Sequence, residues 1–174
     1  MIGWKTNIVL LFFIILIVFL FFIIQSEHKD NIIKNYRIIP SNIDDLNTIT
    51  FITSSNNIIC TTINKLWRVG DSQDSLKKAD HFIVKRLIDS ISNIKLLPII
   101  DINELNNKEL ILSDFGLDNP IKELLIHSDN RKVTWKIGSK SIIDNYVYLM
   151  RENHNIIYKA SIDLISLFPS NTQS

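Results

Sequence analysis

The pattern of apolar and polar positions divides the chain into an apolar N-terminal segment and a long mixed remainder. Every residue from Ile8 to Ile24 is Ile, Leu, Val or Phe. As a helix, this run would span about 25 Å, close to the roughly 30 Å hydrocarbon core of a bilayer. Because a spanning segment must satisfy its own backbone hydrogen bonds, the run predicts a single transmembrane helix.

A cleavable signal peptide is the main alternative interpretation of this segment. Signal peptides have a shorter apolar region and small residues before the cleavage site, whereas the only candidate here, Ile24-Gln25-Ser26, is a poor one. A buried helix of a soluble protein is a weaker alternative, because such helices rarely present apolar residues all round. We therefore expect an uncleaved signal anchor that binds the lipid bilayer through Ile8 to Ile24.

Charged residues beside the apolar run predict its orientation. Lys5 and the free amine lie on the short side, while the charges of residues 27–30 nearly cancel on the other. Basic residues favour the cytoplasmic side of a membrane. The sequence thus predicts a single-pass protein of the inner (cytoplasmic) membrane, with a cytoplasmic N-terminus and a periplasmic or otherwise extracytoplasmic C-terminal domain.

The remainder of the chain predicts one domain behind a short stalk. We divide the chain into an N-terminal segment (residues 1–24), a polar stalk (25–31) and a soluble domain (32–170). Within the domain, short β-branched and aromatic runs alternate with Asn, Asp and Ser, which is typical of antiparallel strands joined by tight turns. The expected pairings involve residues 48–53, 57–63 and 66–69, then 121–128 with 132–137, and 146–150 with 156–159.

Helical periodicity appears mainly between these strands. Apolar residues recur at helical spacing from Lys77 to Asn93 and predict one amphipathic helix with a core-facing stripe. A short helix near Lys108 to Phe115 should end at Gly116, and Ser161 to Phe168 should form a closing helical turn. The expected fold class is α+β: an N-terminal single transmembrane helix, then antiparallel β-hairpins or a meander packed on one main helix.

Composition argues against several classes of function. Without Lys5 the chain carries 18 basic and 18 acidic residues, a balance that gives no electrostatic attraction to nucleic acid. The single cysteine, Cys60, cannot form an internal disulfide. Because Cys60 follows Ile58 and Ile59, a buried side chain is a more natural role for it than a reactive thiol.

The residue types that usually carry chemistry are scattered along the chain. His127 with Asp129 could contribute to a metal site, but a polar pair beside a turn is the commoner meaning of this pattern. The acidic pair Asp44-Asp45 fits the start of a strand or turn better than acid-base catalysis. We therefore expect no catalytic residue, metal or cofactor. The other histidines and the isolated glycines have no motif spacing: His28, His81, His154, Gly70, Gly116 and Gly138.

Four aromatic residues are the candidates for an interaction surface. Tyr146 and Tyr148 share one strand face, and Trp67 and Trp135 lie on other predicted strands. Core packing is the simplest role for all four, because apolar strand faces need such residues. If any of these rings is exposed, a protein or glycan partner becomes the expected reason.

A succession of short motifs resembles a known family. In order, these are Trp67, Ala79-Asp80 before the apolar helix with Val84, Leu87, Ile88 and Ile91, then Phe115-Gly116-Leu117-Asp118-Asn119-Pro120, Ile137-Gly138, Tyr146-Val147-Tyr148 and Ile157-Tyr158. They resemble the bacterial envelope domain of unknown function 4340 family, a companion of auxiliary subunits of gliding-motility-type ABC transporters. The chain departs from the family pattern in having Gly70-Asp71-Ser72 where a proline usually follows the tryptophan. The resemblance implies a membrane segment followed by one α+β repeat, and it implies no catalytic residues.

Two functional hypotheses follow. The preferred one is a non-catalytic, membrane-anchored envelope protein that binds or scaffolds another membrane or periplasmic protein, with an ABC-transporter association implied by the resemblance. The alternative is a periplasmic ligand-binding or hydrolytic domain whose site is assembled from residues distant in the sequence.

Overall fold

The computed structural model describes residues 36–39, 46–129, 131–141 and 144–169, together with residues 14, 16 and 17. The chain divides into two units, Met1–Asn35 and Tyr36–Ser174. In the first unit, Ile14, Leu16 and Ile17 are helical, and the other residues of the predicted membrane helix and stalk lie outside the described residues. No helix in the described part of the chain is long and apolar enough to cross a membrane.

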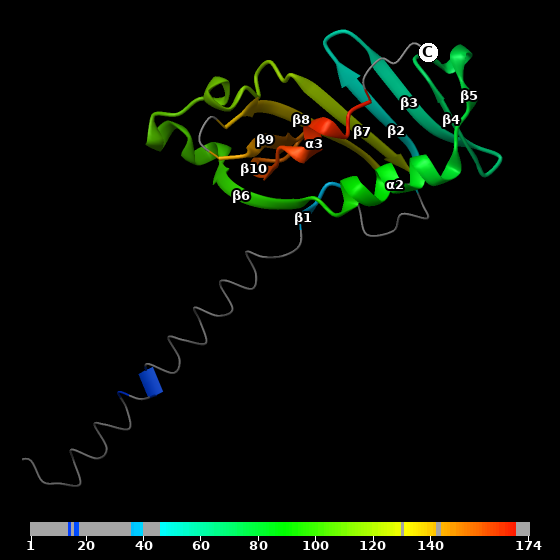
Figure 1. Ribbon diagram of the computed structural model, residues 1–174. Coiled ribbons are helices and arrows are strands. Elements are labelled where there is room, and N and C mark those ends of the chain that lie inside the picture. The colour runs from blue at the N-terminus through cyan, green and yellow to red at the C-terminus, as the bar shows by residue number, and fades with distance from the viewer. Residues whose placement is uncertain are drawn as a thin grey trace, which may run out of the picture. The chain divides into compact units, whose positions relative to one another are not determined.

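The second unit is built on an antiparallel sheet. Within the described residues, ten strands pair in the order β1-β6-β10-β9-β8-β7-β2-β3-β4-β5, and every neighbouring pair is antiparallel (Figure 1). The strands are β1 (Tyr36–Arg37), β2 (Leu46–Thr53), β3 (Asn57–Ile63), β4 (Leu66–Gly70), β5 (Lys77–Lys78), β6 (Lys95–Asp101), β7 (Lys122–Ser128), β8 (Arg131–Lys140), β9 (Tyr146–Arg151) and β10 (Ile156–Ser161).

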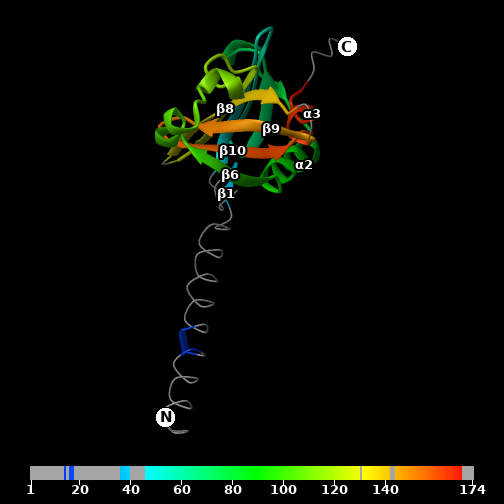
Figure 2. The ribbon, with the colours of Figure 1, turned by 90° about the vertical axis from the view of Figure 1, so that its left-hand side faces the viewer.

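Two meanders make up most of this sheet. One runs from β2 to β5 and the other from β7 to β10, and they join where β2 pairs with β7. The strand β6 extends the second meander beyond β10, and β1 extends it further (Figure 2). The individual hairpins predicted from the sequence are therefore present, but their assembly into one wide sheet was not predicted.

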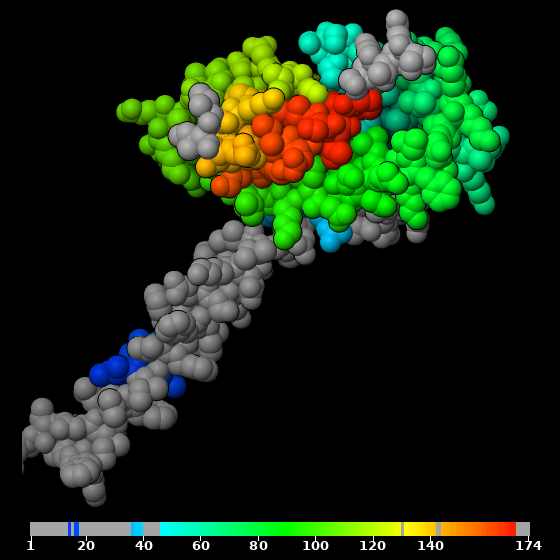
Figure 3. Space-filling model, viewed as in Figure 1, coloured from blue at the N-terminus to red at the C-terminus, as the bar shows by residue number. Residues whose placement is uncertain are grey.

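Helices are few in the described domain. The helix α2 (His81–Ser92) begins after Asp80, whose carboxylate accepts hydrogen bonds from the backbone N–H groups of Phe82 and Ile83 at 2.8 and 3.3 Å. The short helix α3 (Asp163–Ser166) lies beside α2 on the same face (Figure 3). Four 3₁₀ turns complete the description: η2 (Gln73–Ser75), η3 (Ile102–Glu104), η4 (Asn106–Lys108) and η5 (Leu112–Phe115).

The two faces of the sheet bury two different cores. The main core combines one face of the sheet with the buried residues of α2, Val84, Ile88 and Ile91, and with Leu164 of α3. A second core lies on the other face. There the chain from η3 to η5 (residues 102–115), which we call the 3₁₀ segment, covers β9 and β10. Neighbouring residues of a strand point to opposite faces, so Leu149 enters the main core while Met150 enters the second.

The residues preceding β2 are tied into the main core through Trp135. Its indole N–H donates a hydrogen bond to the carbonyl oxygen of Ile38 at 3.0 Å. The ring of Trp135 also packs edge-on against Tyr158, which in turn contacts Tyr36 at 5.2 Å between ring centroids. Ile38 and Ile39 are buried beside them. These contacts join the first described residues of the domain, 36–39, to β8 and β10.

The second core is closed by a backbone contact between two glycines. Gly138 lies in a bulge of β8, and a Cβ atom added there would come within 2.1 Å of the carbonyl oxygen of Phe115. Gly116 has φ of 65°, and it ends η5 as the sequence predicted. A side chain at Gly138 would therefore displace the 3₁₀ segment from the sheet.

The expected fold class, α+β with an N-terminal single transmembrane helix and hairpins packed on one main amphipathic helix, is wrong. The domain is mostly antiparallel sheet, and α2 covers only part of one face. The strands missed in the sequence are β1, β5 and β6. In β6, Pro98 and the unbroken apolar run hid the period-two pattern of a strand.

The expected helix boundaries also need correction. The predicted helix from Lys77 begins instead at His81, because Lys77 and Lys78 pair with β4 and Asp80 caps the first turn. The predicted helix over Lys108 to Phe115 is absent. Glu109, at φ of 54°, interrupts it and separates η4 from η5.

We expect Trp135→Phe to lower the free energy of unfolding by about 2 kcal/mol or more, because it leaves the buried carbonyl of Ile38 without its donor and removes part of a packed ring. The matched control is Trp67→Phe, since Trp67 is half-buried and its indole has no hydrogen-bond partner among the described residues. Chemical unfolding of the full chain in detergent, followed by circular dichroism, measures both. Equal losses would contradict the special role of Trp135.

Candidate functional site

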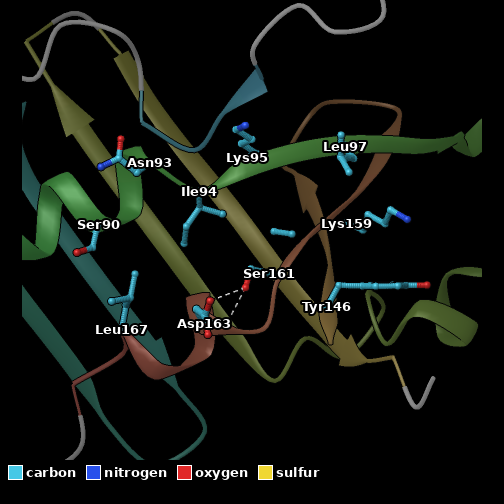
Figure 4. Close-up of a pocket in the computed structure, with 11 residues that line it drawn as sticks. Ser90, Asn93, Ile94, Lys95, Leu97, Tyr146, Lys159, Ser161, Asp163 and Leu167 are labelled. Atoms are coloured by element: carbon cyan, nitrogen blue, oxygen red, sulfur yellow. Dashed lines mark hydrogen bonds between the residues drawn. The ribbon is translucent and has the colours of Figure 1, made fainter. Parts of the chain in front are cut away.

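The clearest candidate site is an open groove of about 780 Å³ beside the end of α2, which we call the Tyr146 groove (Figure 4). Three strands position the walls described next. Lys95 and Leu97 come from β6, Lys159 comes from β10, and Tyr146 comes from the start of β9. The floor is apolar because Ile94, Ala160 and Leu167 line it.

The polar side chains of the Tyr146 groove are held in fixed positions. The hydroxyl of Ser161 donates to a carboxylate oxygen of Asp163 at 2.7 Å, and this carboxylate belongs to the first turn of α3. The ammonium group of Lys159 lies 5.0 Å from the centroid of the Tyr146 ring, a cation–π contact that holds the lysine at the groove. Lys95 has no carboxylate within ion-pair distance among the described residues.

Tyr146 and Tyr148 form a pair on one face of β9. Their hydroxyl oxygens are 3.3 Å apart, and Tyr148 also packs edge-on against Phe115 of the second core. The shared hydrogen bond lowers the pKa of Tyr146 and, together with burial, raises the pKa of Tyr148 to about 12. The sequence expectation of core packing thus fits Tyr148, while Tyr146 reaches the groove.

A second open groove, of about 700 Å³, lies between α2 and the strands β3 and β4. Its walls include Ile58, Val69 and Leu87, and Ile83 at its rim is 67% exposed. Cys60 also lines this groove, is buried, and has its thiol pKa raised to about 11 by burial. A protonated thiol is a poor nucleophile, which favours the structural role expected from the sequence.

His127 and Asp129, which the sequence suggested as a possible metal site, lie apart from both grooves. His127 is exposed on β7, and the carboxylate of Asp129 accepts a hydrogen bond from the side-chain amide of Asn47. Neither residue lines the grooves described above. Asp44, Asp45 and His28 lie outside the described residues. Within those residues, no group of three or more His, Cys, Asp or Glu side chains could hold a metal ion.

Most of the Tyr146 groove could not be predicted from the sequence. Tyr146 was a candidate, but Lys95, Leu97 and Lys159 carry no signal of their own, because β6 was not predicted and these residues meet only when β6 pairs with β10. The feature of the sequence that could have indicated the strand β6 is the apolar stretch around Pro98. Proline is tolerated in a strand where its nitrogen does not face a paired neighbour.

We expect Cys60 to react slowly with thiol reagents in the folded protein at neutral pH, because the buried thiol stays protonated. The raised pKa also stabilises the fold below about pH 9. This contribution is lost as the pH rises from the unfolded value of 9.0 through the folded value of about 11. Stopped-flow labelling measures the reaction rate. The control is Cys60→Ser/Ser166→Cys, which places a thiol at an exposed position of α3; equally fast labelling of both proteins would contradict the prediction.

The motifs behind the family resemblance meet at several contacts. Phe115-Gly116 lies against Gly138, the ring of Phe115 packs edge-on against Tyr148, and the backbone N–H of Ala79 donates to the carbonyl oxygen of Trp67 at 2.9 Å. The remaining motif residues are distributed over β4, α2, β9 and β10. The family assignment itself stays a prediction. No protein-family model, curated protein or solved structure matches the chain.

Proposed function

We propose that the chain is a non-catalytic, membrane-tethered protein of the bacterial envelope whose domain binds another membrane or periplasmic protein. The tether is the apolar segment Ile8–Ile24, whose seventeen apolar residues contribute roughly −5 to −10 kcal/mol to membrane insertion with no charge opposing them. The domain faces the periplasm or the cell exterior. The segment contains no polar group that could move an ion or a substrate, so its role is attachment.

The observation that supports partner binding is the exposed Leu97 at the rim of the Tyr146 groove. Leu97 is 50% exposed on β6, and Ile99 on the same strand is 41% exposed. Exposed apolar side chains next to a concave surface are typical of protein contact sites.

Charge at the groove indicates the chemistry of the partner. Lys95 and Lys159 flank the apolar floor, and Asp163 is the acidic group opposite them, already bound by Ser161. A partner segment with apolar side chains and a carboxylate matches this surface. The resemblance to the envelope family favours a component of an ABC transporter as that partner, and this assignment rests on analogy.

We expect the full chain to stay with the membrane after alkaline carbonate extraction and to release its domain when residues 8–24 are deleted. A reporter fused after Ser174 that is active only in the cytoplasm should be inactive, because the domain is placed outside the cytoplasm. A soluble full chain, or an active cytoplasmic reporter, would contradict the proposed tether or its orientation.

We expect a photo-crosslinking amino acid at Leu97 to capture an envelope protein in intact cells. The matched control is Ile111, which is 59% exposed but lies in the 3₁₀ segment away from the groove. The crosslinked species is identified by mass spectrometry. Lys159→Glu, which reverses a groove charge, should reduce the yield several-fold. The proposal fails if Leu97 gives no adduct, or the same adducts as Ile111.

A further inference from the structure

Six residues in register form a line across the sheet on the face opposite the main core. Lys132 pairs with His127, His127 with Thr48, Thr48 with Thr61, Thr61 with Arg68, and Arg68 with Lys78. These pairs cross β8, β7, β2, β3, β4 and β5. We call the six residues the cationic row: Lys132, His127, Thr48, Thr61, Arg68 and Lys78.

The members of the row share one face of the sheet. Their strand neighbours Ile126, Ile49 and Cys60 are buried in the main core, so the row residues point the other way. The hydroxyl oxygens of Thr48 and Thr61 are 2.7 Å apart, which places these two side chains side by side at the middle of the row.

No ion pair within the described residues involves a charge of the row. Lys108 and Glu104 form the one ion pair found there, so no carboxylate of the described residues lies within 4.0 Å of Lys132, Arg68 or Lys78. The Nε atom of Arg68 is buried and lacks a hydrogen-bond partner in the described part of the chain. A buried donor without a partner costs free energy.

Acidic groups lie beside the row and not within it. Asp129 follows β7 and is bound to Asn47, and Glu123 pairs across the strands with Lys136. At the other end, Asp80 caps α2. The formal positive charges of the row lie at its two ends, with Lys132 at one end and Arg68 and Lys78 at the other.

The row is long and narrow, which favours an extended ligand. Strands in a sheet are about 4.8 Å apart, so six strands place the row along about 24 Å in a narrow line. Arginine and lysine bind sulfate and carboxylate groups, while the threonine hydroxyls can both donate to and accept from sugar hydroxyls. The imidazole of His127 is the one ring in the row, whereas single-stranded nucleic acid is bound on several aromatic side chains that stack successive bases.

We propose that the cationic row binds a linear anionic polysaccharide across the outer face of the sheet. Arg68 and Lys132 hold acidic groups of the chain, and Thr48 and Thr61 contact the sugar between them. This inference goes beyond the proposed protein partner, because the row lies on a different surface from Leu97 and the Tyr146 groove.

The test uses the full chain in detergent and fluorescently labelled heparin oligosaccharides as the sulfated probe, with oligogalacturonate as the carboxylated probe. Fluorescence anisotropy measures the affinity at several salt concentrations. Arg68→Gln/Lys132→Gln should weaken binding at least about tenfold and flatten the salt dependence, because two charged contacts are lost. The matched control, Lys85→Gln/Arg86→Gln, removes the same charges from the exposed side of α2 and should change the affinity less than about twofold.

Thermal unfolding of each variant shows whether a loss of binding reflects a loss of folding. If the double variant unfolds, the anisotropy measurement is repeated with the single variants Lys132→Gln and Arg68→Lys, both of which should weaken binding. Arg68→Lys keeps the positive charge but removes the planar set of donors of the guanidinium group. Three results would overturn the proposal: no binding of either glycan probe at low salt, equal weakening in both double variants, or single-stranded DNA binding at least as tightly. Crosslinking at Leu97 is independent of these outcomes, so the two proposals can fail separately.

Discussion

The pairing of β2 with β7 is the interaction on which the rest of the domain depends. It runs from Leu46 opposite Ser128 to Thr53 opposite Lys122, between strands that are far apart in the sequence. Each meander alone is a strip with two open edges, whereas joined they give one continuous face that can bury a core. Closing so long a loop costs chain entropy before the contacts of the main core repay it, so we expect this pairing to form late in folding.

Two backbone contacts then fix what covers each face of the sheet. Trp135 holds the carbonyl of Ile38 on the side of the main core, and Gly138 admits the carbonyl of Phe115 on the other side. Both contacts connect segments that local propensity cannot bring together. Both contacts bring a group close to a backbone carbonyl. The contact at Ile38 needs the indole N–H of Trp135 as a donor, and the contact at Phe115 needs a glycine at position 138, because a side chain there would clash.

The two proposed surfaces use the sheet in different ways. The Tyr146 groove lies near one side of the sheet, where β6 and β10 bring Leu97, Lys95 and Lys159 together. The cationic row crosses β2 to β5 and continues over β7 and β8, where register alone aligns residues from six strands. A chain with a net charge of only +1 can therefore present local positive surfaces, because the sheet separates charges that are mixed in the sequence.

The sequence by itself determined the local structure: the hairpins, the turn at Gly116, the apolar stripe of α2 and the uniform apolar segment from Ile8 to Ile24. These features depend on residues that are close together in the sequence. The spacing of apolar residues, the residue types at turns and the hydropathy of a segment are therefore enough to predict them. The tertiary structure decided the order of strands, the existence of β6, and both candidate surfaces. The physical reason is that Thr48 and His127, like Leu97 and Lys159, become neighbours only through strand pairing, and the sequence pattern of one strand does not specify which strand will lie beside it.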